Sequence, residues 1–170
     1  MENILDWARL VLATTPIRWA NMARTLPLEL LTRPPAAGEW SALECLQHIL
    51  DSEAVFAARI KYFLAGQDFP NFDPDTEGTP LAAAPSPIEM SDRFSRMRQD
   101  SLAALAALTP DDLKRRARHG ELGMVSLGEM VHNWAAHDFN HTIQAERAIM
   151  QPFILGSGPW QVYFQDHLVK

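Results

Sequence analysis

Apolar residues recur at helical spacing in four long segments of the chain, and no segment shows a convincing alternation of apolar and polar positions. Three of these segments keep the spacing without interruption, at about residues 42–65, 87–108 and 126–150. The fourth runs from about residue 3 to 26 with Pro16 inside it, so we expect a kink or a break there. Four such helices in 170 residues predict an all-α fold, a four-helix bundle that forms a single domain over residues 1–170.

The three uninterrupted segments begin with the same signature, a serine followed three residues later by a glutamate. The pairs are Ser41 and Glu44, Ser86 and Glu89, and Ser126 and Glu129. In a capping box the serine accepts a hydrogen bond from a free backbone N–H of the first turn, and the glutamate accepts one from the serine's amide. We therefore expect three capped helices, ending at Gly66, at Thr109-Pro110 and at Pro152.

Residues 66–87 contain five prolines, which predicts a long loop between the second and third helices. A connection of this length is typical of a functional covering loop or a mobile linker, and a plain crossover between distant helix ends explains it equally well. Weak extended segments are expected near 119–125 and 160–164.

Charge and composition exclude several classes of protein. The net charge is −6 with acids and bases mixed along the chain, whereas a nucleic-acid binder would show a basic face. No apolar run has the length of a membrane span, and Glu2 and Asp6 stand where a signal peptide would be basic. Cys45 is the single cysteine and cannot form an internal disulfide, so a reducing, cytoplasmic location is expected.

The last predicted helix carries three histidines within ten residues. A helix turns by about 100° per residue, so His141 lies about 40° from His137, inside an arc that also holds Met130 and Trp134. His132 lies about 220° away, on the polar face. Two of the three imidazoles are therefore expected to face the core together, and the third to face solvent.

Histidines spaced by four residues project from one helix face as two ligands of one metal ion require. Burying both without a metal would leave up to four ring nitrogens to satisfy, although packing in the core is the simpler alternative. His48 lies two turns into its helix, at the margin of an apolar arc, and is the best third ligand; alone it would be a half-exposed surface histidine. His119, in a Gly-flanked basic turn, and His167, near the end of the sequence, are expected to be mobile and are poor candidates. Three histidines with an open position are typical of a catalytic metal site.

Three other motifs compete with this interpretation. Residues 137–141 have the shape of the HExxH zinc motif with Asp138 in the glutamate position, but the shorter side chain and the missing downstream ligand disfavour a protease. Residues 129–132 form one ExxH unit, whereas di-iron bundles use two. Cys45 precedes His48 by about one turn and could form a nucleophilic pair with it, but a buried helix thiol more often packs.

Two regions of the sequence carry motifs around the candidate histidines. The first region is Gly38-Glu39-Trp40-Ser41-Ala42, leading into Glu44, His48, Asp51 and Glu53. The second runs from Gly123 to Glu129 and on to His137, Asp138, His141 and Gln144, an HDxxHxxQ pattern. Both regions resemble the DinB-like family, which includes damage-inducible proteins and bacillithiol- and mycothiol-dependent enzymes. The resemblance spans most of the chain, with the Pro-rich loop between the two regions.

The resemblance implies a DinB-like four-helix bundle that holds a divalent zinc, nickel or iron ion through His48, His137 and His141, the three histidines that helical geometry selects. Family members are often thiol S-transferases or isomerases, others are labelled metal-dependent hydrolases, and many are homodimers. We therefore expect a homodimeric enzyme that acts on a small molecule, with S-transfer from a low-molecular-weight thiol co-substrate favoured over hydrolysis. A non-catalytic helical dimer with a structural or incidental metal is the third alternative.

No catalytic residue follows from the sequence. Glu44 and Asp138 are weak candidates, since either carboxylate could orient a ligand histidine through its second ring nitrogen. An ordinary capping role for Glu44 and an interhelical contact for Asp138 explain both residues as well. Trp40, Trp134 and the 66–87 loop could line the pocket, although tryptophans in bundles mostly belong to the core.

Overall fold

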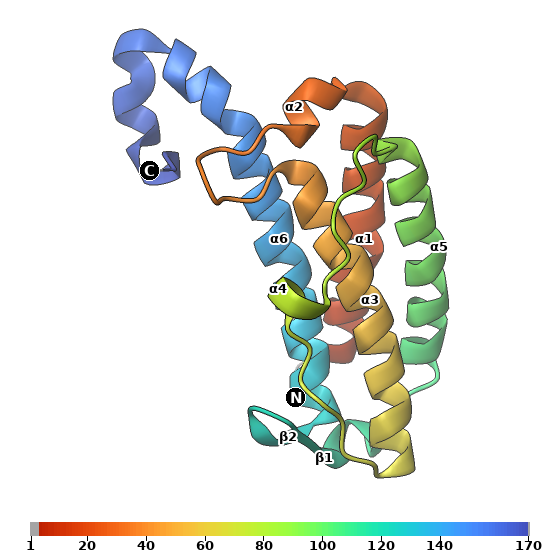
Figure 1. The fold of residues 1–170 in the computed structure, drawn as a ribbon. Helices are drawn as coiled ribbons and strands as arrows, with labels where there is room; N and C mark the ends of the chain where they lie inside the picture. Colours follow the sequence, from red (N-terminus) through yellow and green to blue (C-terminus); the bar gives the residue numbers. More distant parts are fainter. Residues whose placement is uncertain (1–3, 170) are drawn as a thin grey trace.

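Four long helices lie side by side and make up most of the molecule (Figure 1). They are α1 (Ile4–Thr25), α3 (Ala42–Ala65), α5 (Pro87–Ala106) and α6 (Leu127–Gly156). The computed structural model describes residues 4–169, so the expected helix start at residue 3 lies outside the described part. Helices α1 and α3 each pack against both α5 and α6, which closes a ring around the core. The predicted all-α four-helix bundle is confirmed.

Six short elements connect and extend the bundle. They are α2 (Leu28–Thr32), α4 (Pro74–Glu77), the 3-10 helix η1 (Asp112–Lys114), β1 (Arg116–His119), β2 (Gly123–Ser126) and the 3-10 helix η2 (Gly158–His167). Strands β1 and β2 pair antiparallel, with Ala117 opposite Val125. The expected extended segment near 119–125 is thus part of a hairpin, which closes one end of the bundle (Figure 1).

Two of the three expected capping boxes are complete, those of Ser41 with Glu44 and of Ser126 with Glu129. At the start of α5, the Ser86 side chain accepts from the Glu89 amide, but the returning bond of the box is not formed there. That prediction was correct for the helix start and wrong for the second half of the box.

Pro152 does not end its helix where the sequence suggested, and Pro16 does not break α1. Helix α6 runs past Pro152 to Gly156, because proline removes one backbone donor while the buried side chain of Ile154 keeps the last turn on the core. Pro16 likewise lies inside the continuous helix α1. In the Pro-rich loop, Pro74 occupies the first position of the one-turn helix α4, where its missing N–H costs nothing. Helix α3 ends as expected, with Gly66 left-handed at φ 66°.

The expected extended segment at 160–164 is wrong, since these residues belong to η2. Gly158 adopts a left-handed φ of 58° that turns the chain out of α6, and the proline after it favours a helical start. As a result, the end of α6 and η2 form an arm that projects from the bundle (Figure 1).

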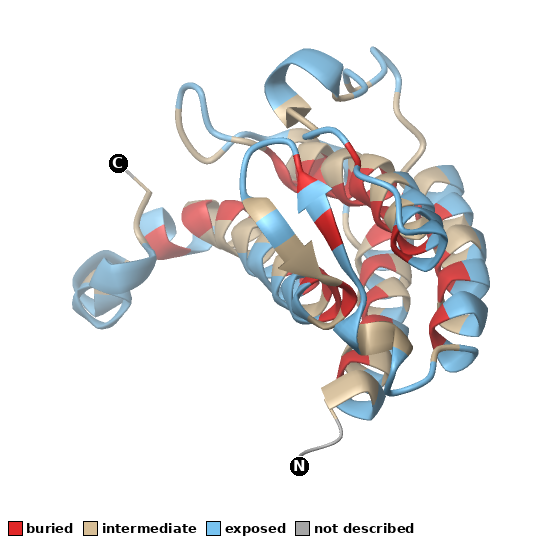
Figure 2. Cartoon of the chain, turned by 90° about the horizontal axis from the view of Figure 1, so that it is seen from below, coloured by how far each residue is buried: buried red, intermediate tan, exposed pale blue. Residues whose placement is uncertain are grey.

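The buried residues lie on the sides of the long helices that face one another, as the view along the bundle shows (Figure 2). They form two apolar clusters, one around Phe56, Phe63 and Trp134 and the other around Trp19 and Phe94. No helix within residues 4–169 combines the length and the hydropathy needed to cross a membrane.

Candidate metal centre

Three histidines from two helices meet on one side of the bundle. His48 projects from α3, and His137 and His141 project from α6, which packs directly against α3. Each offers a ring nitrogen that lies within 4.8 Å of the other two. Nε2 of His48 is 2.9 Å from Nε2 of His137, and the ring centroids of His48 and His141 are 4.3 Å apart. The structure therefore brings together the three residues that the sequence selected.

The ring nitrogens of this histidine cluster are suited to a cation. The amide oxygen of Gln144 lies 2.9 Å from Nδ1 of His141; because that oxygen only accepts, Nδ1 donates and Nε2 keeps its lone pair. Nδ1 of His137 is buried without a hydrogen-bond partner. Nε2 is the nitrogen of His137 that faces Nε2 of His48, so it is the atom available to a cation, and the ring proton then sits on Nδ1.

Burial keeps these imidazoles neutral. It lowers the pKa of His137 to about 3, and the neighbouring His141 and His48 lower it further. Burial also lowers the pKa of His48 to about 4, again with help from His141. The pKa of His141 is lowered for the same reason, despite the opposing effects of Gln144 and Asp138. A neutral imidazole has the free lone pair that metal coordination requires.

Aromatic side chains contact the histidine cluster on two sides. The Trp40 ring lies 5.0 Å from that of His48 and 5.9 Å from that of His141. On the inner side, Phe56 packs edge-on against His137 at 5.5 Å and stacks on the buried Trp134 at 5.0 Å. Trp40 therefore faces the site, whereas Trp134 supports it from the core.

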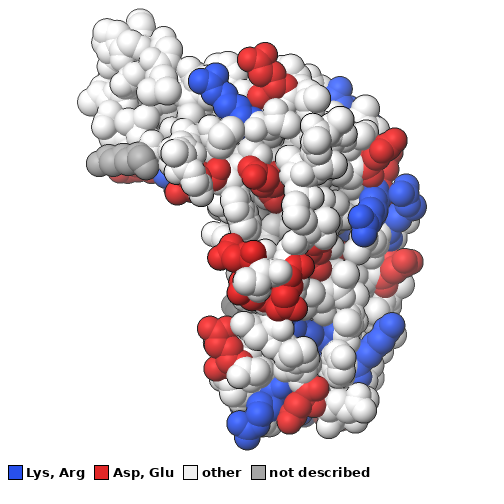
Figure 3. Space-filling model, in the orientation of Figure 1, with Lys and Arg blue, Asp and Glu red and all other residues white. Residues whose placement is uncertain are grey.

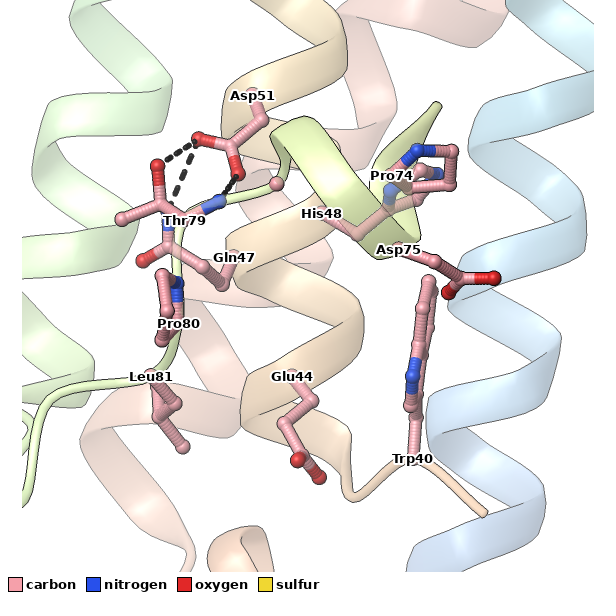
Figure 4. Close-up of a pocket in the computed structure, with 11 residues that line it drawn as sticks. Trp40, Glu44, Gln47, His48, Asp51, Pro74, Asp75, Thr79, Pro80 and Leu81 are labelled. Atoms are coloured by element: carbon pink, nitrogen blue, oxygen red, sulfur yellow. Dashed lines mark hydrogen bonds between the residues drawn. The ribbon is translucent and has the colours of Figure 1, made fainter. Parts of the chain in front are cut away.

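A cavity of about 240 Å³ opens beside His48 and Trp40 (Figure 4). Its other lining residues come from α3 and from the Pro-rich loop: Glu44, Gln47, Asp51, Pro74, Asp75, Gly78, Thr79, Pro80 and Leu81. The Asp51 carboxylate accepts hydrogen bonds from the backbone N–H of Thr79 at 2.7 Å and from its hydroxyl at 3.0 Å. These bonds fasten the loop to α3 at the edge of the cavity, which His48 alone of the three histidines lines.

A sequence model of the DinB superfamily matches residues 12–145. The chain belongs to the DinB superfamily. Its fold is similar to that of YfiT from Bacillus subtilis, described as a probable metal-dependent hydrolase with an unusual four-helix bundle topology; the TM-score is 0.77 at 18% identity, covering 90% of this chain and 89% of YfiT. It is also similar to the DinB-like protein YjoA from Bacillus subtilis, with a TM-score of 0.59 at 16% identity, covering 85% of this chain and 91% of YjoA. No curated protein sequence matches the chain.

The two carboxylates considered for this DinB site bond elsewhere. Glu44 accepts from the backbone and the hydroxyl of Ser41, both at 2.7 Å, as its capping box requires. Asp138 is buried and accepts from the Arg98 guanidinium at 2.6 Å. Among the described residues, the side chain that bonds to the second ring nitrogen of a clustered histidine is Gln144.

The remaining histidines and the cysteine lie away from the cluster. His132 is exposed on the outer face of α6, and His167 is exposed in η2. The expected mobility of His119 is wrong: it is 7% exposed, and its Nδ1 accepts from the backbone amides of Glu121 and Leu122. Burial raises the pKa of the Cys45 thiol to about 12, which disfavours a nucleophilic pair with His48.

Sequence reasoning gave no role to two residues that shape this DinB centre. Gln144 was part of the motif, and its spacing of three residues from His141 was the available signal for a contact. Arg98 is 1% exposed and shares one face of α5 with Phe94 and Leu105. A basic residue at core spacing was the available signal there.

Proposed function

We propose that this DinB member is a metal-dependent enzyme whose cation is held by His48, His137 and His141. The observation that carries the proposal is the convergence of three neutral imidazoles within 4.8 Å beside a cavity of about 240 Å³. Three protein ligands leave a coordination position open, and zinc, nickel and iron all accept imidazole. When bound, such an ion acts as a Lewis acid that lowers the pKa of a nucleophile such as water or a thiol.

The chain's own residues prepare the site for this chemistry. Gln144 holds His141 in one tautomer and orientation, which a ligand needs. Trp40 and Thr79 line the cavity beside His48, and Thr79 is held there by its bond to Asp51. The cavity volume suits a small-molecule substrate.

The cavity lining favours hydrolysis, which reverses the order that the family resemblance suggested. Glu44, Asp51 and Asp75 line the cavity, and no lysine or arginine is among its described lining residues. Acidic side chains also gather on the face that α4 covers (Figure 3). Such a lining favours neutral or cationic substrates and disfavours a thiol that carries carboxylates. The description of YfiT as a probable metal-dependent hydrolase is consistent with this order.

Transfer of a low-molecular-weight thiol to an electrophile is the second candidate. The resemblance of the Trp40–His48 and His137–Gln144 motifs to thiol-dependent family members supports it. The same open position would accept a thiol, and an uncharged carrier would meet no repulsion from the lining.

Metal analysis combined with two assays tests the proposal. We expect about one equivalent of a divalent metal in the purified protein, loss of that metal in His48→Ala, and retention in the exposed control His132→Ala. Chromogenic ester or amide hydrolysis and thiol conjugation to a chromogenic electrophile then separate the two reactions. Absence of stoichiometric metal, together with melting unchanged by a chelator, contradicts the catalytic proposal. Metal without either activity would favour the non-catalytic helical dimer.

We also propose that the chain forms a homodimer through the projecting arm. Phe153, Trp160, Val162 and Tyr163 are each more than 60% exposed, and the arm shows almost no charged side chains (Figure 3). Exposed apolar groups of this density are typical of an interface. Sedimentation of Trp160→Glu should show a weakened dimer, whereas Leu122→Glu, an exposed leucine on the hairpin, should not. A monomeric wild-type protein at micromolar concentration contradicts this proposal.

A further inference from the structure

Arg98 of α5 is buried at the centre of the bundle and uses all five of its N–H donors. Nε and Nη2 donate to the two carboxylate oxygens of Glu53, at 2.9 and 2.6 Å. Nη1 and Nη2 donate to the carboxylate oxygens of Asp138, at 2.6 and 3.1 Å. The remaining Nη1 donor reaches the backbone carbonyl of Leu12 at 2.9 Å. Because Leu12 is in α1 and Glu53 and Asp138 are in α3 and α6, one guanidinium ties together all four long helices.

The contact with Leu12 depends on Pro16. In an α-helix the carbonyl of residue 12 accepts from the N–H of residue 16, and proline has none. Pro16 lies inside the continuous helix α1, so the helix itself supplies no donor from this position. The proline that the sequence marks as a helix breaker thus leaves an acceptor for Arg98 in the core. We call Arg98, Glu53, Asp138 and the Leu12 carbonyl the arginine clamp.

The clamp lies next to the histidine cluster along both helices that supply it. Asp138 follows His137 directly, and Glu53 follows His48 by five residues. A slip of one residue between α3 and α6 would shift the helices by about 1.5 Å and turn a side chain by about 100°, which separates imidazoles that now lie within 4.8 Å. The two forked pairs from Arg98 accept one register of α3 relative to α6.

Stability alone is a weak explanation for such a cluster. Arg98, Glu53 and Asp138 are each no more than 2% exposed, so all three ions have lost their hydration. Replacing a buried ion cluster with apolar side chains is often neutral or stabilising, and register specification is the best-attested use of such groups. The formal charge of the cluster is −1, which also favours a cation at the neighbouring imidazoles.

We propose that the arginine clamp is a positioning device for the metal centre, in which Arg98 sets the register of α3 against α6. This inference rests on the proposed function, because it takes the three histidines to be metal ligands. Arg98, Glu53 and Asp138 are positioning residues and touch neither substrate nor metal.

The first test replaces the clamp completely, with Glu53→Leu, Arg98→Met and Asp138→Leu combined. The variant should unfold at a temperature equal to or above that of the wild type, while its zinc affinity, measured by competition with a chromophoric chelator, falls 10- to 100-fold. The visible spectrum of the Co²⁺-substituted protein should change as well, because it reports coordination geometry. The matched control is Arg24→Met with Asp92→Leu, an exposed ion pair that also joins two helices, and it should leave affinity and spectrum unchanged.

A zinc affinity within twofold of wild type and an unchanged Co²⁺ spectrum in the triple variant would overturn the proposal. Failure of that variant to fold would assign the clamp to folding and overturn it too. The milder Pro16→Ala variant restores a helix donor to the Leu12 carbonyl, which then competes with Arg98. Its stability should hold or rise while zinc affinity falls several-fold; Pro152→Ala in α6 controls for the gain of helix propensity. An unchanged affinity in Pro16→Ala would contradict the inference that Pro16 frees the Leu12 carbonyl for Arg98.

A metal-free measurement separates this proposal from the proposed function. Long-range ¹H–¹⁵N spectra of the histidine rings, recorded with a chelator present, should show shifted signals for His48, His137 and His141 in the triple variant. The ring signals of His119, which lies in β1 outside the cluster, should stay in place. If the wild type binds no metal, the proposed function fails, and these ring signals still decide whether the clamp positions the cluster.

Discussion

Acidification should destabilise the metal-free protein through His137, and the size of the effect follows from the structure. Burial lowers the pKa of His137 to about 3, well below the ordinary value of 6.5. As the pH falls through 6.5 the unfolded chain takes up a proton at this residue, whereas the folded state does so only near pH 3. The stability contributed by the neutral ring is therefore complete above about pH 7.5 and is lost progressively on acidification.

The magnitude at pH 5 is set by the unfolded state. At pH 5 the solution is about 1.5 pH units below the pKa of an unfolded histidine, whereas the folded His137 is still neutral. The free energy of unfolding is therefore about 2 kcal/mol lower at pH 5 than at pH 7.5. His48, with its pKa lowered to about 4, contributes in the same direction; because it is partly exposed, we discount its share to about 1 kcal/mol. A total of about 3 kcal/mol corresponds to a melting temperature lower by roughly 6–12 °C in a domain of this size.

Urea unfolding at pH 7.5 and pH 5.0, with EDTA present throughout, measures this difference. We expect the difference in the free energy of unfolding between pH 7.5 and pH 5.0 to be about 2 kcal/mol smaller in His137→Gln than in the wild type, whatever the stability of the variant at pH 7.5. His132→Gln, on the exposed face of the same helix, is the control and should keep the full dependence. If His137→Gln retained the wild-type difference between the two pH values, the burial argument for the cluster would be refuted.

Three further predictions concern the helix start, the ligand orientation and the loop. Ser126→Ala removes the capping box of α6 and should lower the free energy of unfolding by about 1 kcal/mol in urea, with no change in the metal content of the folded protein. Gln144→Leu leaves Nδ1 of His141 without its acceptor and should weaken zinc binding by roughly 10- to 100-fold in a chelator competition; equal affinity would show that the amide does not orient the ring. Asp51→Ala removes both bonds to Thr79 and should speed amide hydrogen exchange in residues 74–81, measured by mass spectrometry against unchanged exchange in α5.

Much of the fold and part of the site depend on local chemistry, and these could be predicted from the sequence. Helical periodicity and the serine–glutamate signatures act within one or two turns, so they locate the starts of α3, α5 and α6. The same periodicity places His137 and His141 on the inner face of α6 and His132 on the outer face, as the structure confirms. The pairing of two inward imidazoles is a property of one helix and needs no knowledge of its neighbours.

Contacts between distant segments were decided by the tertiary structure. His48 meets His137 because α3 packs against α6. Helical spacing placed His48 at the margin of an apolar arc, but the contact itself depends on how the two helices pack. Pro16 interrupts a helix by local rules, yet α1 continues through it while Arg98 of α5 occupies the carbonyl that the proline leaves free. His119 is buried at the end of β1, although the sequence suggested an exposed turn there. In each case the contact is stabilised by a partner far along the chain, and local patterns of hydrophobic and polar residues do not encode such a partner.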